Sequence, residues 1–318
     1  MIGVLFRIKC GGNMCQKTRR VRDSVLLVML LVSVGVVATN AQKLSAGEII
    51  AKHLESIGKS DLVAKATKRM AIATSEFVII KSPKKAVGSA VLASNGADLA
   101  LFSTFDMRDY QMERIGLFGS KINIPMVELG RRSPLGSFLS VYDKTMDGHI
   151  FGGAIFSTWL FLDPAFNKGK LETEGRKKVG DRTAWIIKYS PKGGLRPESY
   201  IKLYFDAETF QHIRTVYRQT ETESGFHDAG NKATNSQKAP GGWEADMAAN
   251  GSTLTEDFDN FGKDAAGLIL PHRYSIALDI DSQAGTAGFK WKFEISEYRV
   301  VNDFPAGFFN FTGQPGAR

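Results

Sequence analysis

Residues 289–300 have the sequence FKWKFEISEYRV, in which apolar and polar side chains alternate over the first eight positions. Successive side chains of a β-strand point to opposite faces of the sheet, so this pattern predicts a strand with one apolar and one hydrated face. Such strands are typical of antiparallel sheets, because the strands of parallel sheets are buried on both faces. The apolar positions are Phe289, Trp291, Phe293 and Ile295, and the polar positions are Lys290, Lys292, Glu294 and Ser296.

Segments of the same kind extend toward the N-terminus. Between residues 183 and 217, three short strand-like runs are separated by turns, one of them the Lys-Gly-Gly sequence at 192–194. In the run 200–205, Ile201, Leu203 and Phe205 point one way and the intervening residues point the other way. Further strand-like segments lie between residues 70 and 118. About 10 or 11 strands, with no helix between most of them, predict an α+β protein built on a single strongly curved antiparallel sheet.

Three helices are predicted around this sheet. Ser45 and Glu48 have the spacing of a capping box, which indicates the start of a helix that ends at Gly58. A second, shorter helix is expected over residues 60–67. Serine followed by proline at residues 133–134 predicts the start of a third helix, inside an insertion between strands.

Two segments interrupt the strand pattern. Residues 149–162, HIFGGAIFSTWLFL, are apolar, but these 14 residues are too few to span a bilayer, which takes about 20. We therefore expect this segment to be buried against the sheet, with Gly152 and Gly153 allowing close packing. Residues 222–251 are rich in Gly, Ala, Asn and Lys and have no periodicity, so we expect a flexible loop or a functional flap there.

Residues 1–41 have the three parts of a secretory signal peptide. A basic region is followed by the apolar run VLLVMLLVSVGVVA at 25–38, and the sequence TNA at 39–41 places small residues before a cut ahead of Gln42. We expect Sec-type export to the periplasm and a mature domain from 42 to 318. An uncleaved membrane anchor is the alternative, although the apolar run is short for a spanning helix.

Export accounts for most of the charge of this chain, which has 318 residues, a formal net charge of +8 and 2 cysteines. Removal of the signal takes away six bases and one acid, so the net charge falls to +3. Cys10 and Cys15 leave with it, which excludes disulfides, thiolate nucleophiles and cysteine-bound metals in the mature chain. The remaining basic clusters are small and separated by acids, so we predict no nucleic-acid partner.

The sequence contains no pattern that predicts catalysis. It lacks a G-x-S-x-G nucleophile motif, a P-loop and a dinucleotide-binding glycine fingerprint. Carboxylates two residues apart, such as Asp257 and Asp259, fall on one hydrated strand face rather than across a cleft. His272 follows Pro271 in a strand pattern and is expected to be a turn or strand-edge residue. We predict no catalytic residue, no metal site and no cofactor. The histidines isolated in the sequence are His53, His149, His212 and His227.

Four stretches of the chain carry a resemblance to a known family. They are SAGEIIAKHLESIG at 45–58, LYFDAETFQHIRTVYR at 203–218, FDNFGKDAAGLILPHRYSIAL at 258–278 and FEISEYRVVNDFPAGFF at 293–309. In these strand and hairpin signatures the chain resembles the LolA/LolB-type fold and the outer-membrane lipoprotein-sorting proteins. The resemblance implies a half-open antiparallel barrel whose concave face is closed by helices and which binds acyl chains.

The candidate ligand site is the apolar face of this sheet. The chain has 21 Phe, 8 Tyr and 4 Trp, which either fill an ordinary core or leave an apolar cleft open to a ligand. The candidate cleft residues are Trp159, Trp185, Ile201, Leu203, Phe205, Phe289, Trp291 and Phe293.

These observations predict a monomeric periplasmic protein, without catalytic activity, that binds lipid or lipoprotein acyl chains in the cleft. The alternative is a cell-envelope scaffold with the same fold, no lipid ligand and an envelope protein as its partner. A third interpretation is an enzyme, which would require a cleft with His272 beside a carboxylate.

Overall fold

The computed structural model describes most of the chain from residue 44 onward. The described residues are 44–80, 82, 84–119, 121–125, 132–142, 149–163, 169–220, 237–239, 243–245, 249–282 and 285–311. The predicted signal peptide at residues 1–41 and most of the predicted loop at 222–251 lie outside them. These two expectations therefore stay predictions.

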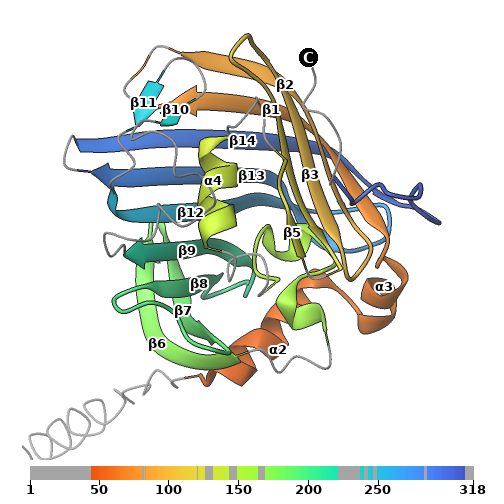
Figure 1. Cartoon of the computed structure of the whole chain (residues 1–318). Helices are drawn as coiled ribbons and strands as arrows, with labels where there is room; N and C mark the ends of the chain where they lie inside the picture. The colour runs from red at the N-terminus through yellow and green to blue at the C-terminus, as the bar shows by residue number, and fades with distance from the viewer. Residues whose placement is uncertain are drawn as a thin grey trace, which may run out of the picture. The chain divides into compact units, whose positions relative to one another are not determined.

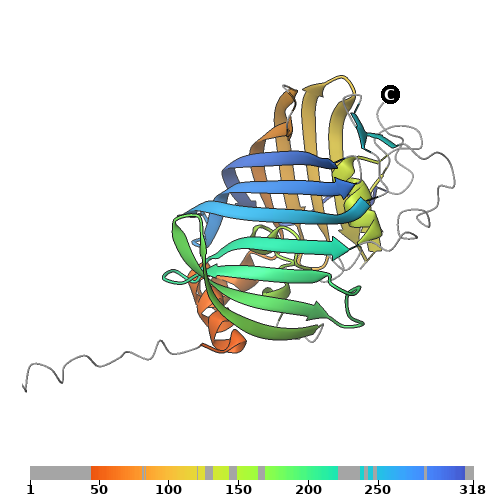
Figure 2. The same cartoon turned by 90° about the vertical axis from the view of Figure 1, so that its left-hand side faces the viewer.

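Twelve strands of the described residues form one antiparallel sheet, in the order β5-β4-β3-β2-β1-β14-β13-β12-β9-β8-β7-β6. The sheet is open, with β5 and β6 at its two edges, and it bends around the helices on one side (Figures 1 and 2). The prediction of a single curved antiparallel sheet is confirmed, with more strands than expected. The strands are β1 (Arg69–Ile79), β2 (Lys85–Ser94), β3 (Leu99–Met107), β4 (Tyr110–Phe118), β5 (Lys121–Asn123), β6 (Gly169–Val179), β7 (Arg182–Pro191), β8 (Tyr200–Asp206), β9 (His212–Thr220), β12 (Ala249–Lys263), β13 (Ile269–Ser282) and β14 (Gly285–Val300).

Strand β14, which contains the alternating FKWKFEIS sequence, lies inside the sheet between β1 and β13. Trp291 is paired with Phe77 on β1 and with Ile276 on β13, and all three are fully buried. Its neighbour Lys292 is paired with Glu76 and bonds to that glutamate on the opposite face. The face that carries Trp291, called the inner face below, is therefore apolar, and the outer face is hydrated.

Both predicted N-terminal helices are present, as α2 (Ala46–Ile57) and α3 (Ser60–Lys65). The capping box of α2 forms as expected. The backbone N–H of Ser45 donates to Glu48 Oε2 at 2.8 Å, and the backbone N–H of Glu48 donates to Ser45 Oγ at 3.3 Å. The apolar face of α2 packs into the core of the sheet, because its buried positions recur at helical spacing.

The third predicted helix is α4 (Pro134–Val141), which Figure 1 shows in front of the sheet. Its cap is Ser133, whose Oγ accepts a hydrogen bond from the backbone N–H of Gly136 at 2.8 Å. The first six residues of α4 are buried, so the helix covers part of the inner face. None of the helices within the described ranges combines the length and the apolar character needed to cross a membrane.

Residues 149–162, called the cover below, also lie on the inner face. They contain two short 3₁₀ turns, η1 (Gly153–Ile155) and η2 (Leu160–Leu162). Almost all of their side chains are buried in the same apolar core as the inner-face side chains. The prediction that this apolar segment is buried against the sheet is confirmed, and the cover occupies the surface where the sequence suggested a cleft.

One local expectation is wrong. His272 lies within β13 rather than at a turn or a strand edge; Pro271 is tolerated because pairing with β14 begins only at Arg273. In the C-terminal half, the short strands β10 (Gln237–Ala239) and β11 (Trp243–Ala245) pair with each other, and β12 begins at Ala249.

Candidate functional site

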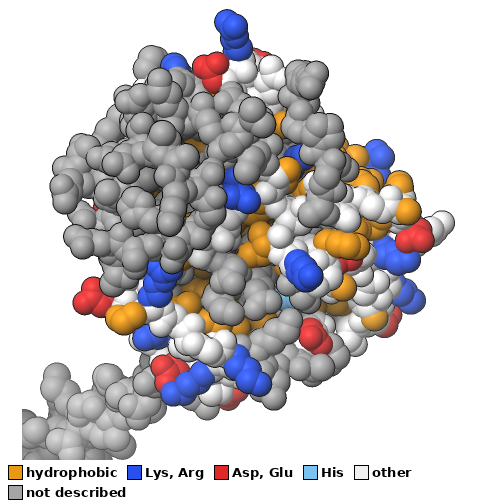
Figure 3. All heavy atoms as spheres, in the orientation of Figure 1, with side chains coloured by type: hydrophobic (Ala, Val, Ile, Leu, Met, Phe, Trp, Pro, Cys, Tyr) orange, Lys and Arg blue, Asp and Glu red, His pale blue; other side chains and the backbone are white. Residues whose placement is uncertain are grey.

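An apolar groove of about 660 Å³ lies between α2, α3 and the end of the cover. Its walls include Leu54 from α2, Val63 and Ala64 from α3, and Phe161 and Leu162 from the cover. Figure 3 shows hydrophobic side chains reaching the surface between charged ones on this side of the molecule. Pockets of about 300–1,000 Å³ with mostly apolar walls are typical of small-molecule sites, so the groove is the natural place for a ligand to enter.

Ser157 attaches the cover to the sheet beside this groove. Its Oγ donates to the carbonyl oxygen of Thr67 at 2.5 Å and accepts from the backbone N–H of Gly96 at 2.9 Å. Its own backbone N–H donates to Ser94 Oγ at 2.7 Å. One wall of the groove is therefore tied to the start of β1 and to the turn between β2 and β3.

Glu256 on β12 holds the cover from the inner face. It is fully buried, and its Oε1 accepts the backbone N–H of Gly152 at 2.7 Å and the hydroxyl of Tyr274. Its Oε2 accepts the hydroxyl of Tyr217 at 2.7 Å. Burial raises the pKa of Glu256 to about 7, although these three hydrogen bonds favour the ionised form. Gly152 has a φ of +74°, and a Cβ there would meet the Phe156 ring at 2.2 Å, so the predicted close packing is confirmed.

Arg69, at the start of β1, makes the third polar attachment of the cover. Its Nε donates to the carbonyl oxygen of Ile155 at 3.0 Å, and its Nη2 donates to the carbonyl oxygen of Ala154 at 2.5 Å. Burial lowers the pKa of Arg69 to about 10, so the guanidinium stays charged at neutral pH. A buried cation is costly unless its donors are satisfied, so the cover and Arg69 stabilise each other.

Two histidines that are far apart in the sequence meet under the cover. The ring centroids of His53 on α2 and His212 on β9 are 6.2 Å apart, and both side chains are buried. Trp159 of the cover stacks on His212 with centroids 4.8 Å apart. Burial lowers the pKa of His53 to about 4 and that of His212 well below its ordinary value. Both rings are therefore neutral at pH 7.

A second buried carboxylate, Glu113, lies on β4 beside the edge strand β5, far from β12 in the strand order. The hydroxyl of Tyr110 donates to its Oε2 at 2.5 Å, and the indole N–H of Trp291 donates to that hydroxyl oxygen at 2.8 Å. Burial raises the pKa of Glu113 to about 7, and its hydrogen bonds partly offset this. Trp291, one of the predicted cleft residues, therefore belongs to a buried chain of hydrogen bonds with Tyr110 and Glu113.

The structure brings all the predicted cleft residues together in one apolar core, but not around the groove. None of them is more than 3% exposed, because α2, α4 and the cover lie over the inner face. Their role in ligand binding stays a prediction, and it would require the cover to move. These residues are Trp159, Trp185, Ile201, Leu203, Phe205, Phe289, Trp291 and Phe293.

Sequence reasoning missed the polar groups that hold the cover, although signals for two of them were present. Glu256 lies between Leu254 and Phe258 at strand spacing, which places a carboxylate on an apolar face. His53 lies four residues after Ile49 and therefore on the buried face of α2. Within the described part of the chain, no group of three or more His, Cys, Asp or Glu side chains is placed to hold a metal ion.

Comparison with known proteins finds likeness only among solved structures, since no family model and no curated protein matches the sequence. A LolA superfamily protein from Nitrosomonas europaea aligns with 84% of this chain and 98% of its own, with 11% identity and a TM-score of 0.42. A DUF1329 family protein from Desulfovibrio piger aligns with 83% and 97%, with 11% identity and a TM-score of 0.42.

An outer membrane lipoprotein-sorting protein domain from Vibrio parahaemolyticus aligns with 82% of this chain and 97% of its own, with 13% identity and a TM-score of 0.38. The LolA-like fold is the one that the sequence stretches resemble. With identities of 11–13%, the likeness is distant.

Proposed function

We propose that this chain is an exported cell-envelope protein that binds an acyl chain of a lipid or lipoprotein and catalyses no reaction. The observation that supports this proposal best is the groove of about 660 Å³ between α2, α3 and the cover, whose surface is mostly apolar. Each methylene of an acyl chain moved from water into such a site contributes about 0.8 kcal/mol. A chain of several methylenes is therefore enough for binding without charged partners.

The groove also offers a route to the inner face. Phe161 lines the groove, and its ring centroid is 5.0 Å from that of Trp159, which is buried under the cover. A ligand that pushes Phe161 aside therefore disturbs the side chain that anchors the cover. In the proposed mechanism the acyl chain first occupies the groove and then replaces the cover on the apolar inner face.

Two measurements test this function. Native mass spectrometry of the protein isolated from the cell envelope should show bound lipid, and the purified protein should bind a fluorescent fatty acyl probe. Replacing half-buried Leu162 in the groove by Asp should weaken probe binding about tenfold or more, because it removes an apolar contact worth about 1.5–3 kcal/mol.

The matched control is Val87→Asp, which changes an exposed apolar residue on β2, outside the groove walls. This variant should bind the probe as the unchanged protein does. Absence of extracted lipid together with absence of probe binding would contradict the proposed function, as would equal loss of binding in the two variants.

A cell-envelope scaffold without a lipid ligand is the second candidate function. It is favoured by one observation, namely that the inner face is already filled by the chain's own cover. In this case a protein partner should co-purify in a fixed ratio and no lipid should be released on extraction.

A further inference from the structure

The cover rests on His53 and His212 through contacts that depend on their protonation. The Nδ1–H of His53 donates to the carbonyl oxygen of Phe210 at 3.0 Å, and its Nε2 accepts the indole N–H of Trp159 at 3.1 Å. Because an indole nitrogen can only donate, Nε2 of His53 carries no proton in this arrangement. A second proton on His53 would set two donors against each other and break its bond to the cover.

His212 is in an equivalent position. Its Nε2 lies 2.8 Å from Thr215 Oγ1 and 3.0 Å from the carbonyl oxygen of Arg214. The carbonyl can only accept and the hydroxyl can accept as well, so the proton is on Nε2 and Nδ1 is bare. Nδ1 faces the cover, since a Cβ added to Gly153 would lie 2.8 Å from it. A second proton on His212 would therefore place a charge directly against the cover.

The surroundings of this histidine pair do not compensate such a charge. The side chains packed against the two rings are Phe205 from β8, Thr215 from β9, Phe258 from β12 and Trp159 from the cover. His53 also lies close to His212, and its charge would lower the pKa of His212 further. A charged histidine ring can reach water only if the cover moves away from the inner face.

We propose that acid releases the cover from the inner face. A second proton on His53 breaks its hydrogen bond to Trp159, and a second proton on His212 places a charge against the cover. This inference concerns the regulation of the site proposed above, but it rests on the cover itself and is tested without a ligand. In the closed state both histidines are neutral, and in the open state they contact water and take up protons at their ordinary pH. Acidification therefore favours the open state.

Glu256 acts in the opposite direction and limits the response. Its pKa is raised in the closed state, so it takes up a proton on acidification and favours closure. Tyr217 and Tyr274, which face Glu256, stay protonated throughout because burial raises the pKa of both well above the ordinary value. Arg69 keeps its charge, and His149 is the titratable side chain of the cover itself. Two histidines oppose one glutamate, and the net effect of acid is opening.

Hydrogen exchange of the purified protein, followed by mass spectrometry between pH 7 and pH 4.5, tests this proposal. Exchange of residues 149–162, corrected for the intrinsic effect of pH and compared with β13 and β14, should rise by about tenfold or more on acidification. Replacing both histidines by glutamine keeps uncharged hydrogen-bonding groups and should abolish the rise. Glu256→Gln should enlarge it.

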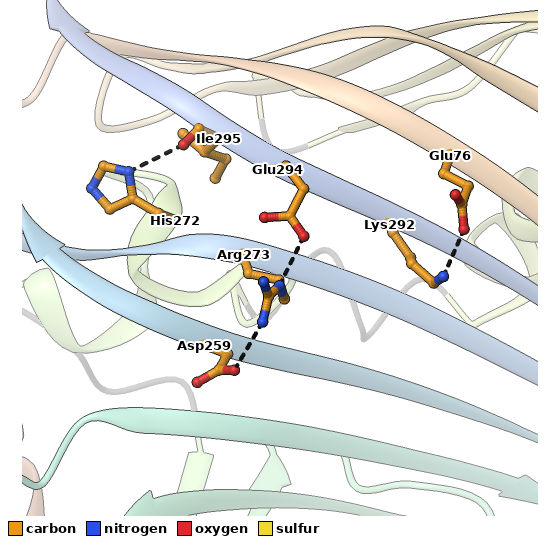
Figure 4. A network of polar contacts seen from close by, with 7 residues as sticks. All are labelled: Glu76, Asp259, His272, Arg273, Lys292, Glu294 and Ile295. Atoms are coloured by element: carbon orange, nitrogen blue, oxygen red, sulfur yellow. Dashed lines mark hydrogen bonds and ion pairs between the residues drawn. The ribbon is translucent and has the colours of Figure 1, made fainter.

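The matched control is His272→Gln. His272 is half-buried in β13, its Nδ1 bonds to the carbonyl oxygen of Ile295, and it lies outside the cover (Figure 4). This variant should keep the full acid response. The proposal is overturned if exchange of the cover does not rise relative to the sheet, or if the double glutamine variant responds like the unchanged protein.

A second measurement needs no substitution. The indole N–H resonance of Trp159 in a nuclear magnetic resonance spectrum reports its bond to His53, and it should change together with the exchange of the cover as the pH falls. If this resonance is unchanged at pH 4.5 while the protein remains folded, the hydrogen bond between His53 and Trp159 does not break and the proposal is wrong. Lipid binding does not enter this result, so it leaves the proposed function to its own test.

Discussion

Polar side chains have opposite environments on the two faces of the same strands. On the outer face, Lys292 bonds to Glu76 at 2.6 Å and Arg273 bonds to Glu294 at 2.8 Å, each with much of its side chain exposed to water (Figure 4). On the inner face, polar groups such as Glu256 and Arg69 are few and fully buried, and they bond to the backbone of the cover.

This difference shows where the structure can carry a function. Exposed ion pairs contribute about 0–1 kcal/mol each and can be exchanged with little loss. A buried polar group whose partner is removed costs about 1–3 kcal/mol, and more if it is charged. The inner polar groups therefore control whether the cover stays in place, whereas the outer groups keep the sheet hydrated.

The largest expected contrast is between two neighbouring residues of β14. Trp291→Ala should lower the free energy of unfolding by about 3–5 kcal/mol, because it leaves a large cavity in the inner core and removes a donor to Tyr110. Lys292→Ala, on the outer face, should cost less than about 1 kcal/mol. Urea unfolding followed by circular dichroism measures both, and equal losses would contradict the division into two faces.

Removal of the guanidinium of Arg69 should have the next largest effect. Arg69→Met keeps the apolar stem but leaves the carbonyl oxygens of Ala154 and Ile155 without their donor, which should cost about 2–4 kcal/mol. Hydrogen exchange should show the loss mainly in the cover. Arg182→Met, which breaks an exposed ion pair with Asp259, is the control and should leave the cover unchanged.

The pH dependence of stability separates Glu256 from the outer carboxylates. The pKa of Glu256 is about 7 in the folded chain against an ordinary value of 4.5, so its contribution is fully present below pH 4.5 and is lost as the pH rises through 7. The difference in unfolding free energy between the unchanged protein and Glu256→Gln should therefore fall with rising pH by at most about 1.4 kcal/mol per unit.

The matched outer-face variant is Asp281→Asn. The hydrogen bond from Arg218 holds the pKa of Asp281 below its usual range, so its contribution is present above that range and is lost only as the pH falls through its lowered value. Chemical unfolding between pH 4.5 and pH 7.5 should show the Glu256 slope and no comparable slope for Asp281→Asn. A flat profile for Glu256→Gln would mean that this carboxylate is not buried.

The smallest expected effect lies wholly on the outer face. Arg273→Ala breaks exposed ion pairs with Glu294 and Asp259 and should cost less than about 1 kcal/mol (Figure 4). Added salt should reduce even this loss, because salt screens exposed charges. A salt-independent loss above 2 kcal/mol, measured by urea unfolding, would show that these outer-face ion pairs contribute more to stability than exposed pairs do.

Local patterns predicted most of the fold and little of the site. The alternation at 289–300 and the capping box at Ser45 and Glu48 depend on neighbours in the chain, and both were predicted correctly. The apolar segment 149–162 was also placed correctly against the sheet. The His53–His212 pair was not predicted, because 159 residues separate two rings that the bend of the sheet brings together.

The sequence by itself determined that this protein is an open antiparallel sheet with one apolar face, because periodicity is a property of each strand alone. Only the tertiary structure decided that the cover closes that face and which polar groups hold it there. The cover, rather than a ligand, occupies this face, and Glu256, Arg69 and His53 hold the cover there. Which surfaces close over one another depends on contacts between distant segments and on the energetic cost of burying each polar group, and neither is encoded in local spacing.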